Sequence, residues 1–152
     1  MSDLIHKASH YNYGSIEVID VIRDWNLNFC LGNTLKYIAR ADHKGTAIQD
    51  LRKAKEYINM EIEYRRQHKT CKWLRKLKAK FRKQKYDAFA VAKDWNIQGW
   101  LLSSLVGLSS VESSDNDVAY LRTIKCYLDT EIMIRESATI TREQILSRAI
   151  GS

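Results

Sequence analysis

The sequence contains an internal repeat, because residues 21–62 align without a gap onto residues 91–132 at an offset of 70 residues. Of the 42 aligned positions, 12 are identical, and they include the tripeptide Asp-Trp-Asn that begins at Asp24 and again at Asp94. Apolar positions keep their character between the copies. The repeat therefore favours two similar halves that share one core. A chain of 152 residues is long enough to bury such a core.

The chain is predicted to be all-helical. It has no proline and only 6 glycines, and its apolar residues recur at spacings of three and four. We expect helices over residues 15–26, 28–42 and from Thr46 onward in the first copy, and over 97–111 and 118–135 in the second. A turn with Gly45 as a left-handed cap and capping boxes at Thr46 and Thr141 are also predicted, the second opening a short C-terminal helix.

These elements predict a pseudo-two-fold helical bundle of two tandem three-helix repeats joined by a basic amphipathic helix. Residues 1–64 form the first repeat, residues 65–85 the connector, and residues 86–152 a degenerate second repeat with the short C-terminal helix. A monomer with internal pseudo-symmetry and a homo-oligomer both fit this pattern.

No apolar run is long enough to cross a bilayer, and the N-terminus lacks the pattern of a signal peptide, so a cytoplasmic protein is expected. Cys30, Cys71 and Cys126 lack C-x-x-C spacing; we expect them to be reduced, with Cys30 and Cys126 in the core. No metal site is expected from the histidines, whose positions do not have ligand spacing.

The connector carries the basic charge of the chain. Residues 65–85 hold 11 of the 25 basic residues and no acidic one, whereas the rest of the chain has 14 basic and 18 acidic residues. Its apolar residues fall on one helical stripe. Three interpretations remain open: a helix that seals the two halves together, a membrane-surface helix, and a nucleic-acid or partner contact. The contact residues would be Arg75, Lys76, Lys80 and Arg82.

A polar constellation marks the first copy. Asn33, Lys36, Tyr37 and Arg40 have the spacing i, i+3, i+4 and i+7, which places them on one helix face. Lys and Arg suit phosphate oxygens, Tyr offers a stacking surface, and Asn can read a base edge. Lys44 and Gly45 follow in the next loop, where glycine permits close backbone approach. The third helix adds Asp50, a candidate for orienting a basic residue or for holding Mg²⁺ through water.

The second copy loses this constellation. In order, Asn33, Lys36, Tyr37, Arg40, Lys44, Gly45 and Asp50 correspond to Ser103, Val106, Gly107, Ser110, Ser114, Asp115 and Tyr120. Ordinary surface drift would exchange polar residues for polar residues, so the loss favours a functional face in the first copy. A solvated helix face in the first copy, or burial of that face in the second, is the alternative. Tyr57, Glu61 and Asp24 persist as Tyr127, Glu131 and Asp94, which predicts structural roles for them.

A stretch of the first copy resembles a small helical family of tailed-phage proteins, through His10-Tyr11, Gly14, Ile16-Glu17-Val18-Ile19-Asp20, Phe29-Cys30-Leu31-Gly32-Asn33, Leu35-Lys36-Tyr37, Arg40, Lys44-Gly45, Asp50-Leu51, Lys53-Ala54 and Tyr57. That family includes a coliphage nucleotide kinase that acts on deoxynucleoside monophosphates without a phosphate loop. The resemblance covers residues 9–63, and the second copy and the connector depart from the family's single-copy pattern. It implies a site with Lys36, Arg40 and Asp50 as catalytic residues and with His10, Gly32, Asn33, Tyr37, Lys44 and Gly45 as ligand-binding residues.

The leading functional hypothesis is a phage protein that binds a nucleotide or another phosphorylated small molecule in the first repeat, with Mg²⁺-assisted phosphoryl transfer as its most concrete form. An ordinary P-loop kinase is excluded, because the sequence has no G-x-x-x-x-G-K-[ST] motif. One alternative is a non-enzymatic protein that inhibits or modulates a host defence protein. Another is a nucleic-acid-binding accessory protein that acts through the connector.

Overall fold

The computed structural model describes residues 14–68, 74, 77, 83–114 and 116–150. Within these ranges the chain is all-helical, as predicted, and contains no strand. None of the described helices is both long enough and apolar enough to cross a membrane. The principal helices are α2 (Val18–Asp24), α3 (Phe29–Arg40), α4 (Ala47–Gln67), α6 (Ala88–Asp94), α7 (Gly99–Ser110) and α8 (Asp117–Ile150).

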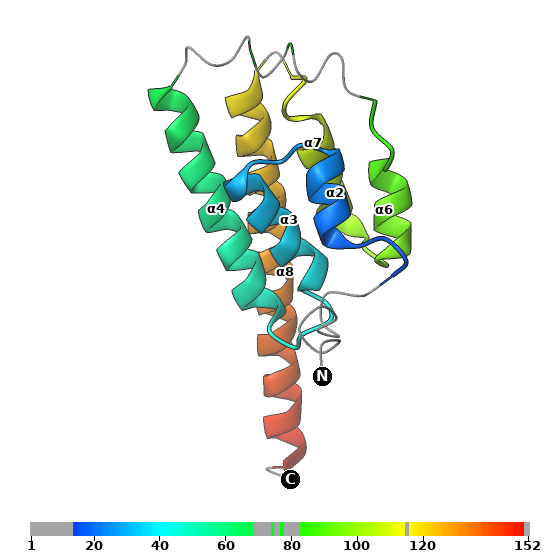
Figure 1. Cartoon of the computed structure of the whole chain (residues 1–152). Coiled ribbons are helices and arrows are strands. Elements are labelled where there is room, and N and C mark those ends of the chain that lie inside the picture. Colours follow the sequence, from blue (N-terminus) through cyan, green and yellow to red (C-terminus); the bar gives the residue numbers. More distant parts are fainter. Residues whose placement is uncertain (1–13, 69–73, 75–76, 78–82, 115, 151–152) are drawn as a thin grey trace, which may run out of the picture.

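The helices pack around one continuous core. Helices α4 and α8 pack against each other, α3 packs on α4, and α7 packs on α8, while the short helices α2 and α6 cover α3 and α7 (Figure 1). Apolar side chains from both halves belong to the same buried cluster, which the predicted three- and four-residue spacing supplies. Its largest fully buried members are Trp25, Leu31, Leu35, Ile38, Leu51, Ile58, Trp95, Leu101, Leu105, Leu108, Leu121 and Ile124.

The helix starts recur at the offset found in the sequence. Helices α2, α3 and α4 begin at residues 18, 29 and 47, and α6, α7 and α8 begin at residues 88, 99 and 117. The repeated asparagine after each short helix has a left-handed backbone, with φ of 51° at Asn26 and 54° at Asn96. Asparagine tolerates this region better than most residues, so it lets both short helices end in the same way.

Two buried tryptophans hydrogen-bond across the halves in matching ways. The Nε1 of Trp25 donates to the carbonyl oxygen of Tyr86, and the Nε1 of Trp95 donates to the carbonyl oxygen of Ile16, both at 2.8 Å. Positions 16 and 86 are themselves 70 residues apart. Each half thus fixes the segment that leads into the other half's first helix, and each buried indole N–H has the partner that burial demands.

The aspartates beside these tryptophans act in the same crossed manner. The carboxylate of Asp24 accepts from the backbone amides of Lys85 and Tyr86. The carboxylate of Asp94 accepts from the amides of Ser15 and Ile16 and from the Ser15 hydroxyl. The predicted structural hydrogen-bonding role of Asp24 and Asp94 is therefore confirmed.

The local signals around α3 and α4 are confirmed in part. Asn28 is the N-cap of α3, and its Oδ1 accepts from the amide of Leu31 at 3.0 Å. Gly45 has a φ of 72°, the left-handed conformation that was predicted for it. The predicted capping box at Thr46 is wrong, because this residue precedes α4 without any side-chain cap hydrogen bond.

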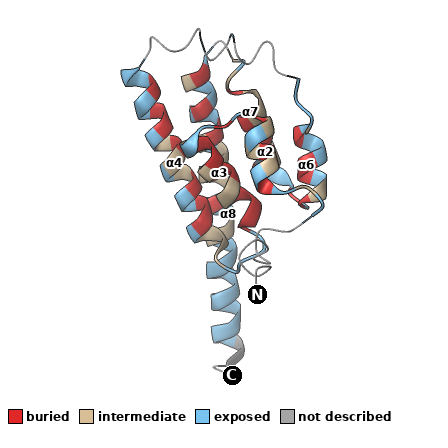
Figure 2. Cartoon of the chain, in the orientation of Figure 1, coloured by how far each residue is buried: buried red, intermediate tan, exposed pale blue. Residues whose placement is uncertain are grey.

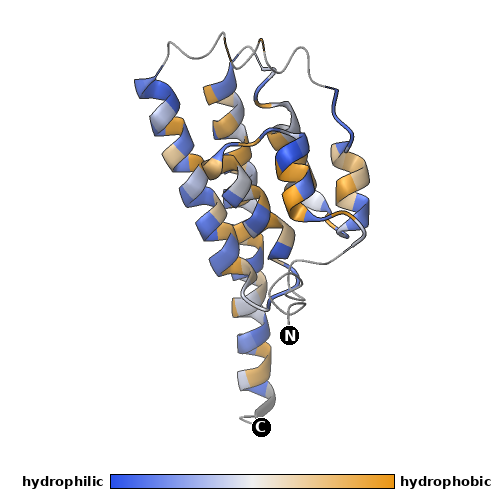
Figure 3. Cartoon of the chain, in the orientation of Figure 1, coloured by the Kyte–Doolittle hydropathy of each residue, from blue (hydrophilic) through white to orange (hydrophobic). Residues whose placement is uncertain are grey.

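The C-terminal helices expected to end at Arg135 and to restart at Thr141 are instead one helix, α8, of 34 residues. The hydroxyls of Thr139 and Thr141 donate to the carbonyl oxygens of Arg135 and Ser137 within the helix, at 2.9 and 3.0 Å. Each hydroxyl donates to the carbonyl oxygen four residues before it in the same helix, so neither residue acts as a helix cap. The distal part of α8 projects beyond the other helices, is exposed, and carries apolar and polar residues side by side (Figures 2 and 3).

The cysteines occupy more exposed positions than expected. Cys126 is exposed and Cys30 is only partly buried, so the prediction that both lie in the core is wrong. In α8 the core positions are Ile124 and Leu128, and Cys126 falls on the opposite face between them. Burial, and secondarily the negative charge of Glu61, raise the pKa of the Cys30 thiol, which keeps it protonated at neutral pH. Cys71 lies outside the described residues.

Candidate functional site

The antiparallel pair α3 and α4 brings three aromatic rings into contact on one face. Tyr37 of α3 stacks on Tyr57 of α4, with ring centroids 5.8 Å apart and planes 19° apart. Phe29, at the start of α3, meets Tyr57 edge-on at 5.9 Å. Phe29 is 75% exposed although it is a large apolar residue. We call Tyr37, Tyr57 and Phe29 the aromatic row; Phe29 is exposed and the two tyrosines are partly exposed, so the row offers a stacking surface.

Two lysines flank the aromatic row. The Nζ atoms of Lys36 and Lys53 lie 4.9 and 5.6 Å from the centroid of the Tyr37 ring, within the range of a cation–π contact. The Oδ1 of Asn33 accepts from Lys36 Nζ at 2.8 Å, and its Nδ2 donates to the carbonyl oxygen of Phe29. In the described part of the chain Lys36 pairs with no carboxylate, so its charge is available to an anion.

A hollow of about 650 Å³ adjoins the aromatic row. This volume lies within the usual range of small-molecule sites. Two of its cations are already paired with α8, since Arg52 contacts Glu136 at 2.6 Å and Lys55 contacts Asp129 at 2.5 Å. The hollow is lined by Tyr37, Arg52, Lys53, Lys55, Glu56, Tyr57 and Met60.

The structure corrects the roles expected of Arg40 and Asp50. The guanidinium of Arg40 donates from Nε and Nη2 to the two carboxylate oxygens of Asp50, at 2.7 and 2.8 Å, and both residues are buried. Its Cζ also lies 4.5 Å from the Tyr37 ring centroid. Asp50 thus orients a basic residue, as one alternative held, and its occupied oxygens do not fit a Mg²⁺ site. The buried guanidinium of Arg40 packs against the Tyr37 ring, and its Nε and Nη2 donors are used by Asp50 and not by a phosphate.

Three of the expected ligand-binding residues do not line the hollow beside the aromatic row. Gly32 is buried, and a Cβ there would lie 3.2 Å from Cγ2 of Ile22, so this glycine serves the packing of α2 on α3. Lys44 is exposed in the loop between α3 and α4. Gly45 lines a different hollow, of about 480 Å³, together with Arg135 of α8.

Part of the predicted constellation lies outside the described residues. This holds for His10 and for the connector residues Arg75, Lys76, Lys80 and Arg82. Of the predicted apolar stripe, Leu74 and Leu77 are described, and they are 41% and 45% exposed. Leu74 and Leu77 are therefore not buried between the two halves, which argues against the interpretation that the connector joins the halves through these two positions. Within the described ranges, no three His, Cys, Asp or Glu side chains are grouped to hold a metal.

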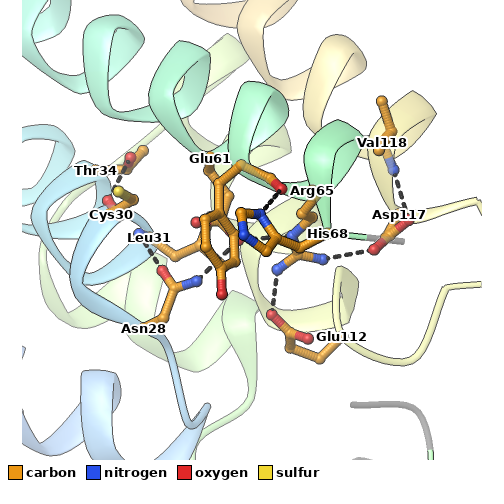
Figure 4. Close-up of polar contacts among 11 residues, drawn as sticks. Asn28, Cys30, Leu31, Thr34, Glu61, Arg65, His68, Glu112, Asp117 and Val118 are labelled. Carbon is orange, nitrogen blue, oxygen red and sulfur yellow. Dashed lines mark hydrogen bonds and ion pairs between the residues drawn. The ribbon is translucent and has the colours of Figure 1, made fainter. Parts of the chain in front are cut away.

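A second polar cluster surrounds Arg65 near the end of α4 (Figure 4). Its guanidinium donates to the carboxylates of Glu61, Glu112 and Asp117, at 2.6, 2.5 and 3.0 Å. Glu61 also accepts from the Nδ2 of Asn28. Burial lowers the pKa of Arg65, but the adjacent carboxylates raise it more, so the net pKa lies above the ordinary value. The cluster holds α4 to the start of α8, which confirms the structural role predicted for Glu61.

An equivalent cluster occurs 70 residues later. Arg135 of α8 contacts Glu131 at 2.7 Å and Asp42, in the loop between α3 and α4, at 2.5 Å. Asp42 and Glu112 occupy corresponding positions of the two copies. Each arginine thus joins the long helix of one half to the loop of the other half. These charged residues hold the bundle together, and the candidate site is left to the aromatic row and its lysines.

Three residues at the site were not predicted to bind a ligand. Lys53 and Phe29 belong to the stretch that resembles the tailed-phage family but were not assigned to its site, and Tyr57 was predicted to be structural because it persists in the second copy. The comparison of the copies carried a usable signal, since Lys53 corresponds to Thr123 and Phe29 to Gly99. Lys53 and Phe29 are thus replaced in the second copy together with Lys36. A complete list of the residues that the second copy replaces would have included both.

Residues 5–59 match a family described as a protein of unknown function (DUF3310). The matched residues include α2, α3 and the first part of α4, and hence the whole aromatic row. Neither the comparison with curated proteins nor the comparison with solved structures gives a match.

Proposed function

We propose that the first half binds a nucleotide or a similar phosphorylated small molecule on the aromatic row. The observation that carries this proposal is the placement of the Lys36 and Lys53 ammonium groups beside the Tyr37 ring, 4.9 and 5.6 Å from its centroid. A flat base can stack on the accessible parts of these rings while the two lysines neutralise phosphate. The ligand is therefore an anion with an aromatic part.

The supporting residues have distinct tasks in this proposal. Asn33 orients Lys36 through its Oδ1, and its amide is engaged with the carbonyl oxygen of Phe29, so it positions a cation and does not read a base. The buried pair of Arg40 and Asp50 fixes the position of Tyr37 from beneath. A site whose contact residues are held by such neighbours loses less entropy when the ligand binds.

The second half supports the assignment by contrast. At the positions of Lys36, Tyr37 and Lys53 it has Val106, Gly107 and Thr123, which provide neither cation nor ring. The matching helix starts and the crossed hydrogen bonds of Trp25 and Trp95 support two tandem three-helix repeats in a pseudo-two-fold bundle. In this arrangement one repeat keeps the ligand site and the other completes the shared core.

Phosphoryl transfer is the most concrete form of the proposal. It rests on the resemblance of residues 9–63 to the tailed-phage family that includes a nucleotide kinase, a stretch that overlaps the family match. Phosphoryl transfer depends mainly on positioning and on neutralising the charge of the phosphates, and Lys36 and Lys53 can supply both. The setting would be the cytoplasm of a phage-infected bacterium, where nucleotides are abundant.

A thermal-shift panel of mono-, di- and triphosphate nucleotides, with and without Mg²⁺, tests the binding. We expect one nucleotide class to raise the melting temperature of the wild-type protein and to lose this effect in Lys36→Ala. Lys93→Ala, which removes an exposed lysine of α6, is the matched control and should respond like the wild type. A panel without any shift, or an equal shift in Lys36→Ala, would overturn the proposal and favour a protein or nucleic-acid partner.

A further inference from the structure

The second half has a hollow of its own at the position that corresponds to the candidate site. It encloses about 400 Å³ between α6, α7 and α8, again within the size range of small-molecule sites. It is lined by Phe89, Leu102, Ser103, Val106, Gly107, Tyr120, Thr123, Ile124 and Tyr127. We call it the α7–α8 pocket.

The α7–α8 pocket exists because large side chains of the first half are missing here. Tyr37 and Arg40 fill the first half's face, and their counterparts are Gly107 and Ser110. The counterpart of Asp50 is Tyr120, which is 40% exposed and lines the pocket wall. The buried ion pair of one half is thus replaced in the other by an open apolar hollow.

The helix contact behind the pocket is fully packed. A Cβ at Gly107 would lie 2.6 Å from Cγ1 of Ile124, so α7 approaches α8 as closely as glycine allows. In the first half, Tyr37 of α3 corresponds to Gly107 and Ala54 of α4 corresponds to Ile124. The large side chain of the pair is thus on α3 in the first half and on α8 in the second. With glycine in place of tyrosine, α7 and α8 remain in contact, but the second half has no ring at the position of Tyr37. The pocket is therefore a shaped concavity on a tight helix pair and not a packing defect.

The lining of the pocket selects an uncharged ligand. Among the described residues that line it, none is Asp, Glu, Lys or Arg, and three are aromatic. Phe89, at the edge of the pocket, is 62% exposed, so an apolar ligand bound there would remove its ring from water. A phosphate would find no cation here, whereas an apolar ring would bury the exposed aromatic surface.

Two hydroxyls provide the polar part of the lining. The hydroxyl of Thr123 already donates to the carbonyl oxygen of Ala119 at 3.1 Å. The hydroxyl of Ser103 makes no hydrogen bond to any described residue and so can bond one polar group of a ligand. An apolar pocket with one such polar group is the usual composition of a site for a small organic molecule.

We propose that the α7–α8 pocket binds a neutral aromatic small molecule that carries one hydrogen-bonding group. The ligand's ring lies among Phe89, Tyr120 and Tyr127, and its polar group reaches Ser103. This site is separate from the aromatic row of the first half and differs from it chemically, because its lining is uncharged whereas the aromatic row is flanked by Lys36 and Lys53.

The test uses the full chain and the neutral dye N-phenyl-1-naphthylamine, which fluoresces strongly in apolar surroundings. We expect saturable fluorescence with the wild-type protein and about tenfold weaker binding in Thr123→Trp, whose indole would fill the pocket. Arg122→Trp is the matched control, because it adds the same side chain to the neighbouring exposed position outside the lining, and it should bind like the wild type.

Ser103→Trp fills the pocket from α7 and should weaken dye binding to the same extent as Thr123→Trp, which fills it from α8. Agreement between the two variants would show that the loss does not come from misfolding of one of them. Lys36→Ala should leave dye binding unchanged, which separates this site from the first half. Absence of saturable binding to the wild type, or equal binding by Thr123→Trp and Arg122→Trp, would overturn the proposal.

Discussion

The two halves of the molecule share a scaffold and differ on one face. Their tryptophans and aspartates make matching contacts at a 70-residue offset, and their long-helix arginines share two of the three carboxylate contacts that Arg65 makes. On the face formed by α3 and α4, Tyr37 covers a buried ion pair and is flanked by lysines, whereas the face formed by α7 and α8 is hollow and apolar. The comparison teaches that the contacts joining the halves are constrained, while the outer face of each half has changed independently.

The largest expected effect comes from breaking the buried pair that only the first half has. Arg40→Ser and Asp50→Tyr, each taken from the second half, should separately lower the free energy of unfolding by about 3–5 kcal/mol, because each removes the bidentate partner of a buried charge. The double variant strands no charge and should cost less than the sum of the two. Urea denaturation of the four proteins measures this coupling. Strictly additive costs would show that the pair is not a unit.

The next effect concerns the tight helix contact that only the second half has. Gly107→Ala places a Cβ 2.6 Å from Cγ1 of Ile124 and should lower the free energy of unfolding by about 1–3 kcal/mol through overpacking. In an Ile124→Ala background the same change should cost almost nothing, because the first half has Ala54 at that position. An equal cost in both backgrounds, measured by urea denaturation, would locate the strain elsewhere.

A smaller effect is expected from the crossed aspartates, and it depends on pH. Burial raises the pKa of Asp94, but hydrogen bonds from Ile16 and Ser15 lower it more, so its net pKa lies below the ordinary value. Its stabilising contribution is therefore complete above about pH 4, the ordinary carboxyl pKa, and is lost as the pH falls through the lower folded-state pKa. Asp94→Asn should lower the free energy of unfolding by about 1–2 kcal/mol at neutral pH. This deficit should shrink in acid, and a deficit independent of pH would contradict the assignment.

The smallest effect is expected from the part of α8 that has no counterpart in α4. Position 137 corresponds to Gln67, the last residue of α4, and the side chains of residues 138–148 are all exposed. Deleting residues 138–152 should change the free energy of unfolding by less than about 0.5 kcal/mol. The deletion retains Arg135 and Glu136, which contact the first half. A large loss of stability would show that the projecting helix belongs to the folded unit.

The sequence predicted the all-helical fold better than it predicted the site. The 70-residue offset and the apolar spacing were enough for the helices, because burial of one helix face depends on local pattern. The continuity of α8 was missed, because Thr141 can cap a helix or bond within one, and only the surrounding helix decides between them.

The site was harder to predict because it depends on pairing. Arg40 and Asp50 are ten positions apart on different helices, and residue type alone does not distinguish a phosphate ligand from a buried ion pair. Their joint replacement by Ser110 and Tyr120 was the available signal that they act together. The crossed bonds of the tryptophans to the opposite half are tertiary contacts that no local pattern contains.

The central claim, that the first half binds a phosphorylated ligand through Lys36 and Lys53, is tested most directly by isothermal titration calorimetry. The nucleotide that shifts the melting temperature most is titrated into the wild type and into Lys36→Val/Lys53→Thr, which carries the second half's residues. The account predicts measurable binding to the wild type, and loss of most of the affinity in the variant with an unchanged melting temperature of the free protein. Equal affinity of the two proteins would contradict it.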